Sequence, residues 1–330
     1  MGDICAPGLT GRRALLLGLT SGVFAAVSAC AAPAETGTGG AGSPDERRDL
    51  AAAASPGPSV AGQQVPAPTQ PPPTQAPATH SLPAQAPPGT PVVAQPPSKA
   101  QLVAEFAGRR PTEWGLEVAG VVTRSPAQKT VITLDACGGP GGSGVDQELL
   151  AILRRLNIPA TLFVNARWIH ANRQLAAELG KDPLFELANH GWLHRPLSVT
   201  GRTAYGIPGT VSVADAYDEL TGCQDVLLEA AGEPSRFFRA GTAYFDDVAA
   251  AMTRRMGILP VNFSINADAG ATMPPKAVAS ALSAAGPGDI VIAHFNKPAS
   301  GTAAGFRHAL PRLRDGGIEF GRLGDVLPAL

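Results

Sequence analysis

Two histidines four positions apart give the strongest chemical signal in this sequence. His190 and His194 flank the tripeptide Gly191-Trp192-Leu193, so their imidazoles lie one helical turn or one tight loop apart. That separation suits two ligands of one metal ion. With 6 His in 330 residues, about 0.1 such pair is expected by chance. The pair therefore indicates a metal site, with two unrelated surface histidines as the alternative.

Three other polar residues each close a short apolar, strand-like run. They are Asp135, Arg239 and His294. A carboxylate at the end of a buried strand is unfavourable unless it is paired, bound to a metal or catalytic. Taken singly, each residue is explained equally well by a turn, an ion pair or an exposed position.

The elements that would position these residues alternate along the chain. Short apolar, β-branched runs predict strands, and apolar residues at helical spacing predict helices between them. The predicted strands are 131–134, 160–164, 185–188, 237–239, 259–265 and 290–293, and the predicted helices run through 149–156, 172–179 and 213–231. This alternation predicts an α/β fold with a parallel sheet covered by helices, either open or closed into a barrel. Polar residues that follow the strands should gather at one edge of that sheet.

In their order along the chain, these segments resemble the polysaccharide deacetylase family, carbohydrate esterase family 4. The resemblance runs from about Lys129 to Leu327. The segments that carry it are Thr133-Leu134-Asp135 (start of the T-F-D-D motif), 190–194 (H-S/T-x-x-H), Phe238-Arg239 (start of R-P-P-Y/F), Ile292-Ala293-His294 (L-x-H), and the strand segments 158–164 and 316–320.

This resemblance implies a distorted β/α barrel and the metal-dependent removal of N-acetyl groups from a cell-envelope or extracellular polysaccharide, peptidoglycan included. It implies that His190 and His194 hold a divalent ion, zinc by preference, which polarises the acetyl carbonyl and acidifies a bound water. By the same carry-over, Asp135 takes the proton from that water and Arg239 keeps Asp135 ionised. His294 then protonates the departing amine.

The metal motif departs from the family at its second aspartate. Ala136 stands where the family has a metal-binding Asp, and Cys137 follows in place of Gly. Three protein ligands and one open position are usual for catalytic zinc. We therefore expect either loose metal binding or an additional ligand, Asp135 in the first place and Cys137 as the weaker alternative. On this reasoning Ala136→Asp should tighten metal binding.

Two other motifs also differ. Residues 239–243 read R-A-G-T-A where the family has R-P-P-Y-G. The pocket wall around Thr242, which in the family includes an aromatic ring, is therefore altered. Residues 266–270 read N-A-D-A-G where the family has D-x-x-D-W. Asp268 is displaced by one position from the expected carboxylate, and it could still orient His294 through a hydrogen bond.

The N-terminus has the layout of an exported lipoprotein. Arg12-Arg13 precede an apolar stretch, which ends in Val27-Ser28-Ala29-Cys30. That ending resembles a lipobox, and the paired arginines resemble a twin-arginine signal. We expect residues 1–29 to be removed as a signal peptide and a lipid on Cys30 to anchor the protein to the membrane outside the cytoplasm. An uncleaved membrane helix is the alternative, for which the apolar stretch is short.

Composition divides the rest of the chain. Residues 30–98 are rich in Pro and Ala, and this composition predicts a disordered linker, whether a stalk or an unselected spacer. Residues 99–330 suffice for one globular domain. A net charge of −1 argues against nucleic acid as a partner. Cys137 and Cys223 fall in the domain, and we expect two thiols rather than a disulfide.

Three functions stay open. The first is an active hydrolase of acetylated glycan, favoured because base, arginine, two imidazoles and acid occur together. The second is a catalytically silent glycan-binding envelope lipoprotein that lacks the family's third metal ligand. The third is hydrolysis of another amide or ester, because the segment around Thr242 could reshape the pocket.

Overall fold

The structure, a computed structural model, describes residues 96–328 and 330. The predicted signal peptide, Cys30 and most of the predicted linker lie outside the described residues. Within the described part of the chain, no helix combines the length and apolarity needed to cross a membrane.

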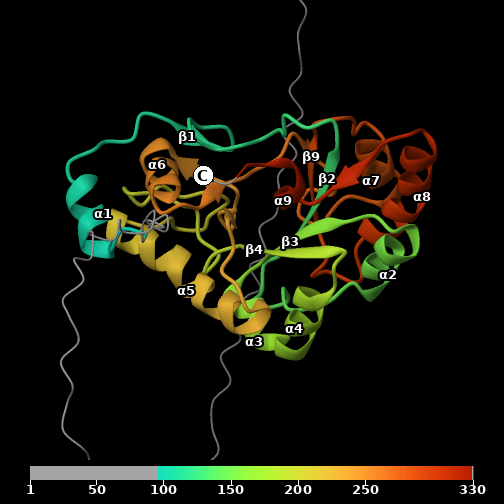
Figure 1. The fold of residues 1–330 in the computed structure, drawn as a ribbon, viewed down its shortest axis with the longest axis horizontal. Coiled ribbons are helices and arrows are strands. Elements are labelled where there is room, and N and C mark those ends of the chain that lie inside the picture. Colours follow the sequence, from blue (N-terminus) through green and yellow to red (C-terminus); the bar gives the residue numbers. More distant parts are fainter. Residues whose placement is uncertain (1–95, 329) are drawn as a thin grey trace, which may run out of the picture. The chain divides into compact units, whose positions relative to one another are not determined.

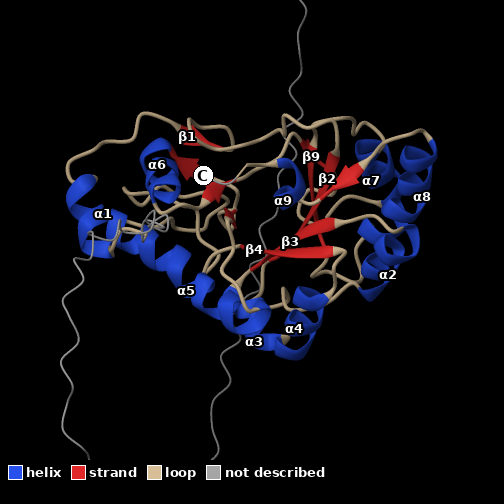
Figure 2. Cartoon of the chain, in the orientation of Figure 1, coloured by secondary structure: helices blue, strands red, loops and turns tan. Residues whose placement is uncertain are grey.

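A parallel sheet forms the centre of the unit (Figure 1 and Figure 2). Its strands follow the order β7 (Leu259–Pro260), β5 (Phe237–Phe238), β4 (Phe185–Asn189), β3 (Ala160–Val164), β2 (Thr130–Ala136), β9 (Ile290–His294) and β8 (Ile265–Asn266), and β10 (Phe320–Gly321) pairs with the start of β2. The sheet curls into a half-barrel, with β7 and β8 at the ends of the order. This confirms the predicted α/β fold of the distorted β/α-barrel type.

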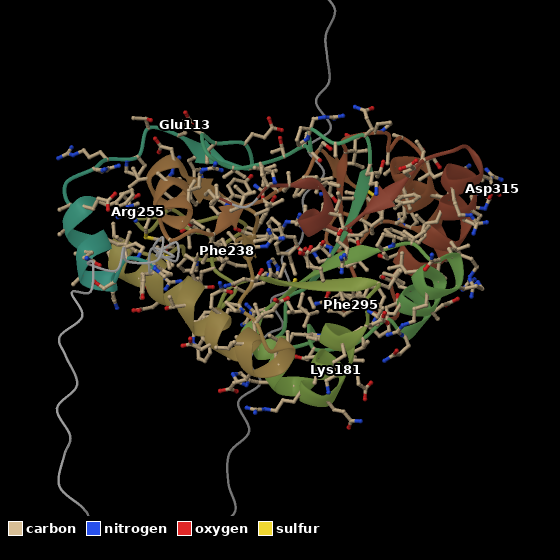
Figure 3. All side chains as sticks on the ribbon, in the orientation of Figure 1. Glu113, Lys181, Phe238, Arg255, Phe295 and Asp315 are labelled. Carbon is tan, nitrogen blue, oxygen red and sulfur yellow. The ribbon has the colours of Figure 1, made fainter. Side chains whose placement is uncertain are left out.

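The outer face of the sheet is covered by helices that share one large apolar cluster, namely α2 (Gln147–Leu156), α3 (Ala166–Ala171), α4 (Arg173–Lys181), α5 (Val213–Ala231), α7 (Pro275–Leu282) and α8 (Thr302–Asp315). Two further helices, α1 (Lys99–Glu105) and α6 (Asp247–Arg255), belong to a second apolar cluster. The short α9 (Leu323–Val326) packs with Val131 on the opposite face of the sheet. A small antiparallel pair joins β1 (Trp114–Gly115) to β6 (Phe245–Asp246). In Figure 3, Phe238 and Phe295 lie inside the unit, and charged residues such as Lys181 and Asp315 lie at its rim.

Side chains on β2 alternate between two environments, as the period of a strand requires. Ile132, Leu134 and Ala136 belong to the large apolar cluster that includes residues of α2, α7 and α8. Val131 belongs to a separate cluster on the opposite face. Asp135 shares this second face by the same alternation, so β2 directs its carboxylate to the concave side of the half-barrel.

The predicted elements agree with the structure where local signals were strong. The helix 213–231 and the strand 160–164 have the predicted bounds. Ser212 caps α5 by accepting a hydrogen bond from the Asp215 amide at 3.1 Å, and Gly232 ends it in the left-handed conformation with φ 81°, as these residue types favour.

The single strand predicted at 259–265 is wrong, because the chain forms β7 and β8 there and leaves the sheet between them. The Val261 and Asn262 carbonyls in this gap accept hydrogen bonds from the Arg239 side chain at 3.2 and 3.0 Å. The Asn262 amide group also donates to the Ala243 carbonyl at 2.7 Å. This segment therefore holds a buried guanidinium instead of extending the sheet.

Candidate active site

A cavity of about 380 Å³ opens at the carboxyl-terminal edge of the sheet. Its lining includes Asp135 and Cys137 from the end of β2, His194 from the loop after β4, and His294 from the end of β9. Residues far apart in the sequence thus converge where parallel strands end, as the fold class predicts.

Asp135 and Arg239 form a buried ion pair at the base of this cavity. Arg239 Nη1 donates to Asp135 Oδ1 at 2.6 Å and to Thr133 Oγ1 at 2.9 Å. The Arg239 side chain is fully buried and its guanidinium carbon lies 4.1 Å from the centre of the Phe163 ring. Burial lowers the pKa of Arg239, against the charge and hydrogen bond of Asp135, but a guanidinium still remains protonated at neutral pH. The pairing expected between these two residues is therefore present.

His190 lies behind the cavity wall, beside Asp135 and His194. Its Nδ1 lies 3.0 Å from the Arg239 carbonyl oxygen, so Nδ1–H donates there and the neutral ring presents Nε2 as an acceptor. That Nε2 is buried without a hydrogen-bond partner and lies 3.5 Å from Asp135 Oδ2. Burial opposes a charge on this ring, but Asp135 and Cys137 raise the pKa of His190 above its usual value.

His194 is brought beside His190 by a strained loop. Its φ is 63°, a left-handed value that is uncommon outside glycine. The centroids of the two imidazole rings lie 4.8 Å apart, and the ring planes are at 87° to each other. His194 Nε2 is likewise buried without a hydrogen-bond partner. Cys137 completes the group, because its Sγ and one nitrogen of each imidazole all lie within 4.8 Å of one another.

These three side chains fit a metal ion. A thiolate and two imidazoles are ligands that zinc accepts, and three protein ligands leave one position for water or substrate. The two buried, unpartnered Nε2 atoms also require a partner, since buried polar atoms are rarely left unpaired. Burial raises the pKa of Cys137, but the neighbouring imidazoles of His194, His190 and His294 lower it to well below its usual value.

Two residues that hold this loop were not predicted. The buried Glu219 on α5 accepts hydrogen bonds from the Leu193 amide at 3.0 Å and the Arg195 amide at 3.2 Å. A Cβ at Gly241 would collide with the backbone and ring of His194. The sequence signal for Gly241 was its place in the altered segment after Arg239, whereas Glu219 has no local signal.

His294 is held on the other side of the cavity. Its Nδ1 lies 2.9 Å from Asp268 Oδ1, and its backbone amide donates to Asp268 Oδ2 at 2.7 Å. Thr302 Oγ1 also donates to Oδ2 at 2.9 Å. Burial lowers the pKa of His294, but the charge and hydrogen bond of Asp268 raise it to well above its usual value. The raised pKa favours the protonated ring that a proton donor needs, and the contacts with Asp268 fix the orientation of this ring.

Ala136 does not face the metal ligands. Its side chain lies in the apolar cluster with Leu134 on the helix-covered face of the sheet, whereas Asp135 points the other way. An aspartate at 136 would place its carboxylate among apolar side chains. This placement contradicts the assumption that residue 136 faces the cavity, on which the prediction that Ala136→Asp tightens metal binding depended.

The described cysteines are both free thiols. Cys223 lies on α5, and its Sγ donates to the Val164 carbonyl at 3.4 Å. Burial raises the pKa of Cys223 to about 12, so this thiol is inert by comparison with Cys137.

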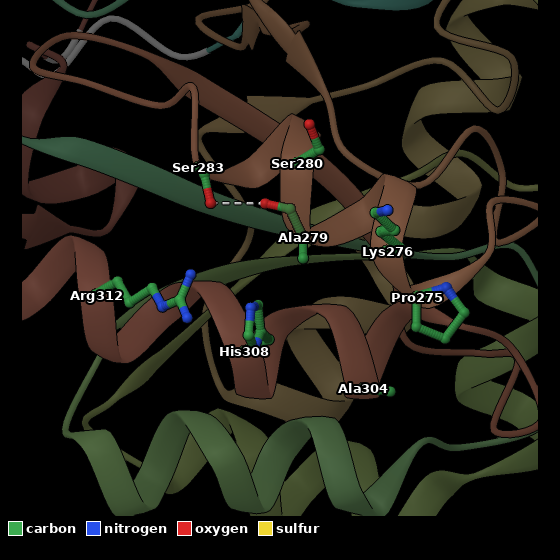
Figure 4. A pocket seen from close by; sticks show the side chains of 8 residues that line it. All are labelled: Pro275, Lys276, Ala279, Ser280, Ser283, Ala304, His308 and Arg312. Atoms are coloured by element: carbon green, nitrogen blue, oxygen red, sulfur yellow. Dashed lines mark hydrogen bonds between the residues drawn. The ribbon is translucent and has the colours of Figure 1, made fainter.

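A second depression, of about 600 Å³, lies between α7 and α8 (Figure 4). Lys276 comes from α7, and His308 and Arg312 come from α8. Its lining includes no residue at the end of a strand and none of the residues described above. The site residues predicted from the sequence therefore do not line this depression.

Residues 123–261 match a protein-family model described as polysaccharide deacetylase. A search of curated proteins found no significant match. Similar solved structures include a pseudoenzyme of carbohydrate esterase family 4 from Bacillus anthracis, with 19% identity, TM-score 0.54, and 64% of this chain and 70% of that chain covered. A variant of that protein with restored enzymatic activity is also similar.

Two further structures share this fold. One is a family 4 carbohydrate esterase from Bacillus anthracis, with 21% identity, TM-score 0.51, and 66% of this chain and 96% of that chain covered. The other is a peptidoglycan N-acetylglucosamine deacetylase, with 16% identity, TM-score 0.54, and coverages of 63% and 92%. Residues 123–261 are therefore similar to the polysaccharide deacetylase family, and the solved structures share the fold of this chain.

Proposed function

We propose that this protein removes N-acetyl groups from an acetylated glycan of the cell envelope, of which peptidoglycan is one example, at a divalent metal ion held by His190 and His194. One observation carries the proposal. A buried carboxylate paired with Arg239 and an imidazole paired with Asp268 face one cavity, beside two imidazole nitrogens that have no protein partner. Such a group provides a base, an acid and a metal site within reach of one bound acetamide.

The metal would polarise the acetyl carbonyl and lower the pKa of the attacking water. Asp135 then accepts the proton of that water, because Arg239 fixes Oδ1 and leaves Oδ2 toward the cavity. Arg239 also stabilises the ionised form of this base through its charge. The base is therefore oriented before substrate arrives.

His294 supplies the opposite proton transfer. An amine anion is a very poor leaving group, so the amide nitrogen must gain a proton as the C–N bond breaks. Asp268 holds Nδ1 at 2.9 Å and directs the other ring nitrogen, Nε2, to the cavity. Acetate and a free amine on the sugar are the products.

Acetate release tests the proposal. The purified full-length protein, loaded with zinc, is incubated with N-acetylglucosamine oligomers and with peptidoglycan, and acetate is quantified. We expect release by the native protein, and losses of at least about a hundredfold in Asp135→Asn and His294→Gln. Arg307→Gln, on the exposed face of α8, is the control variant and should act normally. Release that is equal in all four proteins would contradict the assignment.

A silent glycan-binding role is the second candidate. It is favoured by Ala136 in place of the family's metal-binding aspartate and by the fold shared with a family 4 pseudoenzyme. It predicts glycan binding without acetate release by the zinc-loaded protein. Binding measured by calorimetry beside the acetate assay separates the two functions.

Membrane attachment through Cys30 is a further part of this proposal, supported by the sequence Val27-Ser28-Ala29-Cys30. The expected substrate is an envelope glycan, which a lipid-anchored protein outside the cytoplasm would meet. Cys30→Ala should release the protein from the membrane fraction. An unmodified thiol at Cys30 in the mature protein would contradict the anchor.

A further inference from the structure

We propose that Cys137 is the third protein ligand of the metal, so that the site binds through one sulfur and two nitrogen atoms in place of the family's carboxylate and two imidazoles. This inference rests on the metal site of the proposed function. It goes further by naming the ligand set and the class of metal that this set selects.

The first argument is distance. Tetrahedral zinc, with bonds of about 2.3 Å to sulfur and about 2.0–2.1 Å to nitrogen, holds its ligand atoms roughly 3.3–3.6 Å apart. The Cys137 Sγ and the two imidazole nitrogens already lie within 4.8 Å of one another. Closing onto an ion would need shifts of about 1 Å, which rotation of these side chains can supply.

The second argument is that the nearby carboxylates already have partners, Asp135 through one oxygen and Asp268 through both. Asp135 Oδ1 accepts from Arg239 at 2.6 Å, and both oxygens of Asp268 accept from His294, with Thr302 as a further donor. Ala136 has no ligand atom and faces the apolar cluster. Among the described residues, Cys137, His190 and His194 form the group whose potential ligand atoms lie close enough together to hold one metal ion.

The third argument is the division of tasks at the end of β2. Asp135 and Cys137 are two residues apart and both line the cavity, whereas the intervening Ala136 points to the other face. A sulfur ligand at 137 leaves Asp135 free to act as the base. If Asp135 were the ligand, coordination would reduce its basicity and would compete with its ion pair to Arg239.

The choice of sulfur has a chemical consequence. Thiolate is a soft ligand that suits zinc and cobalt, whereas magnesium and manganese prefer oxygen ligands. We therefore expect the protein to retain zinc and cobalt and to bind manganese and magnesium poorly. The same thiol should be protected from alkylation when the metal is bound, because coordination withdraws electron density from the sulfur and limits access to it.

Cobalt spectroscopy tests the ligand without reference to turnover. The full-length protein is stripped with a chelator, loaded with cobalt(II) and compared with Cys137→Ser, Cys137→Asp and the control Cys223→Ala. We expect a sulfur-to-cobalt charge-transfer band in the native protein and in Cys223→Ala, and its loss in both Cys137 variants. Zinc affinity, from competition with a chromophoric chelator, should fall at least about tenfold in Cys137→Ser. Cys137→Asp should keep three ligands and gain manganese binding.

Three results would overturn the inference. The first is a cobalt-loaded native protein without the charge-transfer band, and the second is a band that survives in Cys137→Ser. The third is an acyl group on Cys137, detected by mass spectrometry after incubation with substrate, which would make the thiol a nucleophile. A band without acetate release would instead support the ligand and contradict the proposed hydrolysis, so the two proposals fail separately.

Discussion

The buried ion pair between Arg239 and Asp135 allows a quantitative prediction for Arg239→Met. Methionine keeps an unbranched side chain but removes every donor of the guanidinium. The Arg239 and Asp135 side chains are 0% and 3% exposed, so the variant leaves a buried carboxylate without its partner. Breaking one side of such a pair costs about 3–5 kcal/mol. For a domain of this size, that corresponds to a melting temperature lower by about 6–20 °C.

Matched variants separate the stranded charge from a general loss of packing. Arg236 lies before the same short strand and is exposed, so Arg236→Met should cost no more than about 0.5 kcal/mol. Adding Asp135→Asn to Arg239→Met removes the stranded charge. We expect the double variant to recover about 1–3 kcal/mol relative to the sum of the two single losses.

The assay is urea unfolding of the full-length protein at pH 7, followed by circular dichroism, for the native chain, the three single variants and the double variant. If Arg239→Met and Arg236→Met lost equal stability, the buried pair would have no measurable value. If the losses of Arg239→Met and Asp135→Asn simply added, the argument from a stranded charge would be refuted.

Three further predictions concern geometry, chemistry and pH. Gly241→Ala should lower zinc affinity at least about tenfold, because the new Cβ would displace His194. The control Gly286→Ala, whose Cβ would have no atom closer than 3.8 Å, should bind zinc normally. Equal zinc affinities of the two variants would show that the loop adapts. His294→Gln should keep its zinc content, measured by atomic absorption, while turnover falls about 10²–10⁴-fold, and parallel loss of metal would make His294 a ligand. Burial raises the pKa of Glu186 above its usual 4.5, so the folded state binds this proton more tightly than the unfolded chain does. The contribution of Glu186 to folding stability is therefore largest below the usual pKa, and it is lost as pH rises through the raised pKa. Glu186→Gln, uncharged throughout, should therefore gain stability relative to the native protein between about pH 4 and 7 in urea unfolding, and a pH-independent difference would contradict this.

Much of the fold could be predicted because its signals are local. A β-branched apolar run defines a strand such as 160–164, and helical spacing with a Ser212 cap and a following glycine defines 213–231. The strand predicted at 259–265 was wrong for a nonlocal reason. Its carbonyls bind the side chain of Arg239, which lies 22 and 23 residues earlier.

The sequence by itself determined the fold class and the types and order of the residues that could act on an acetamide, because strands, helices and the spacing of His190 and His194 depend on near neighbours in the chain. Only the tertiary structure decided how these residues meet. Asp135 and Arg239 pair across 104 residues, and Glu219 holds the loop before His194 from another element. The direction of a side chain at a strand end also depends on which face of the sheet is covered, and that places Ala136 in the apolar core and Cys137 beside the two imidazoles.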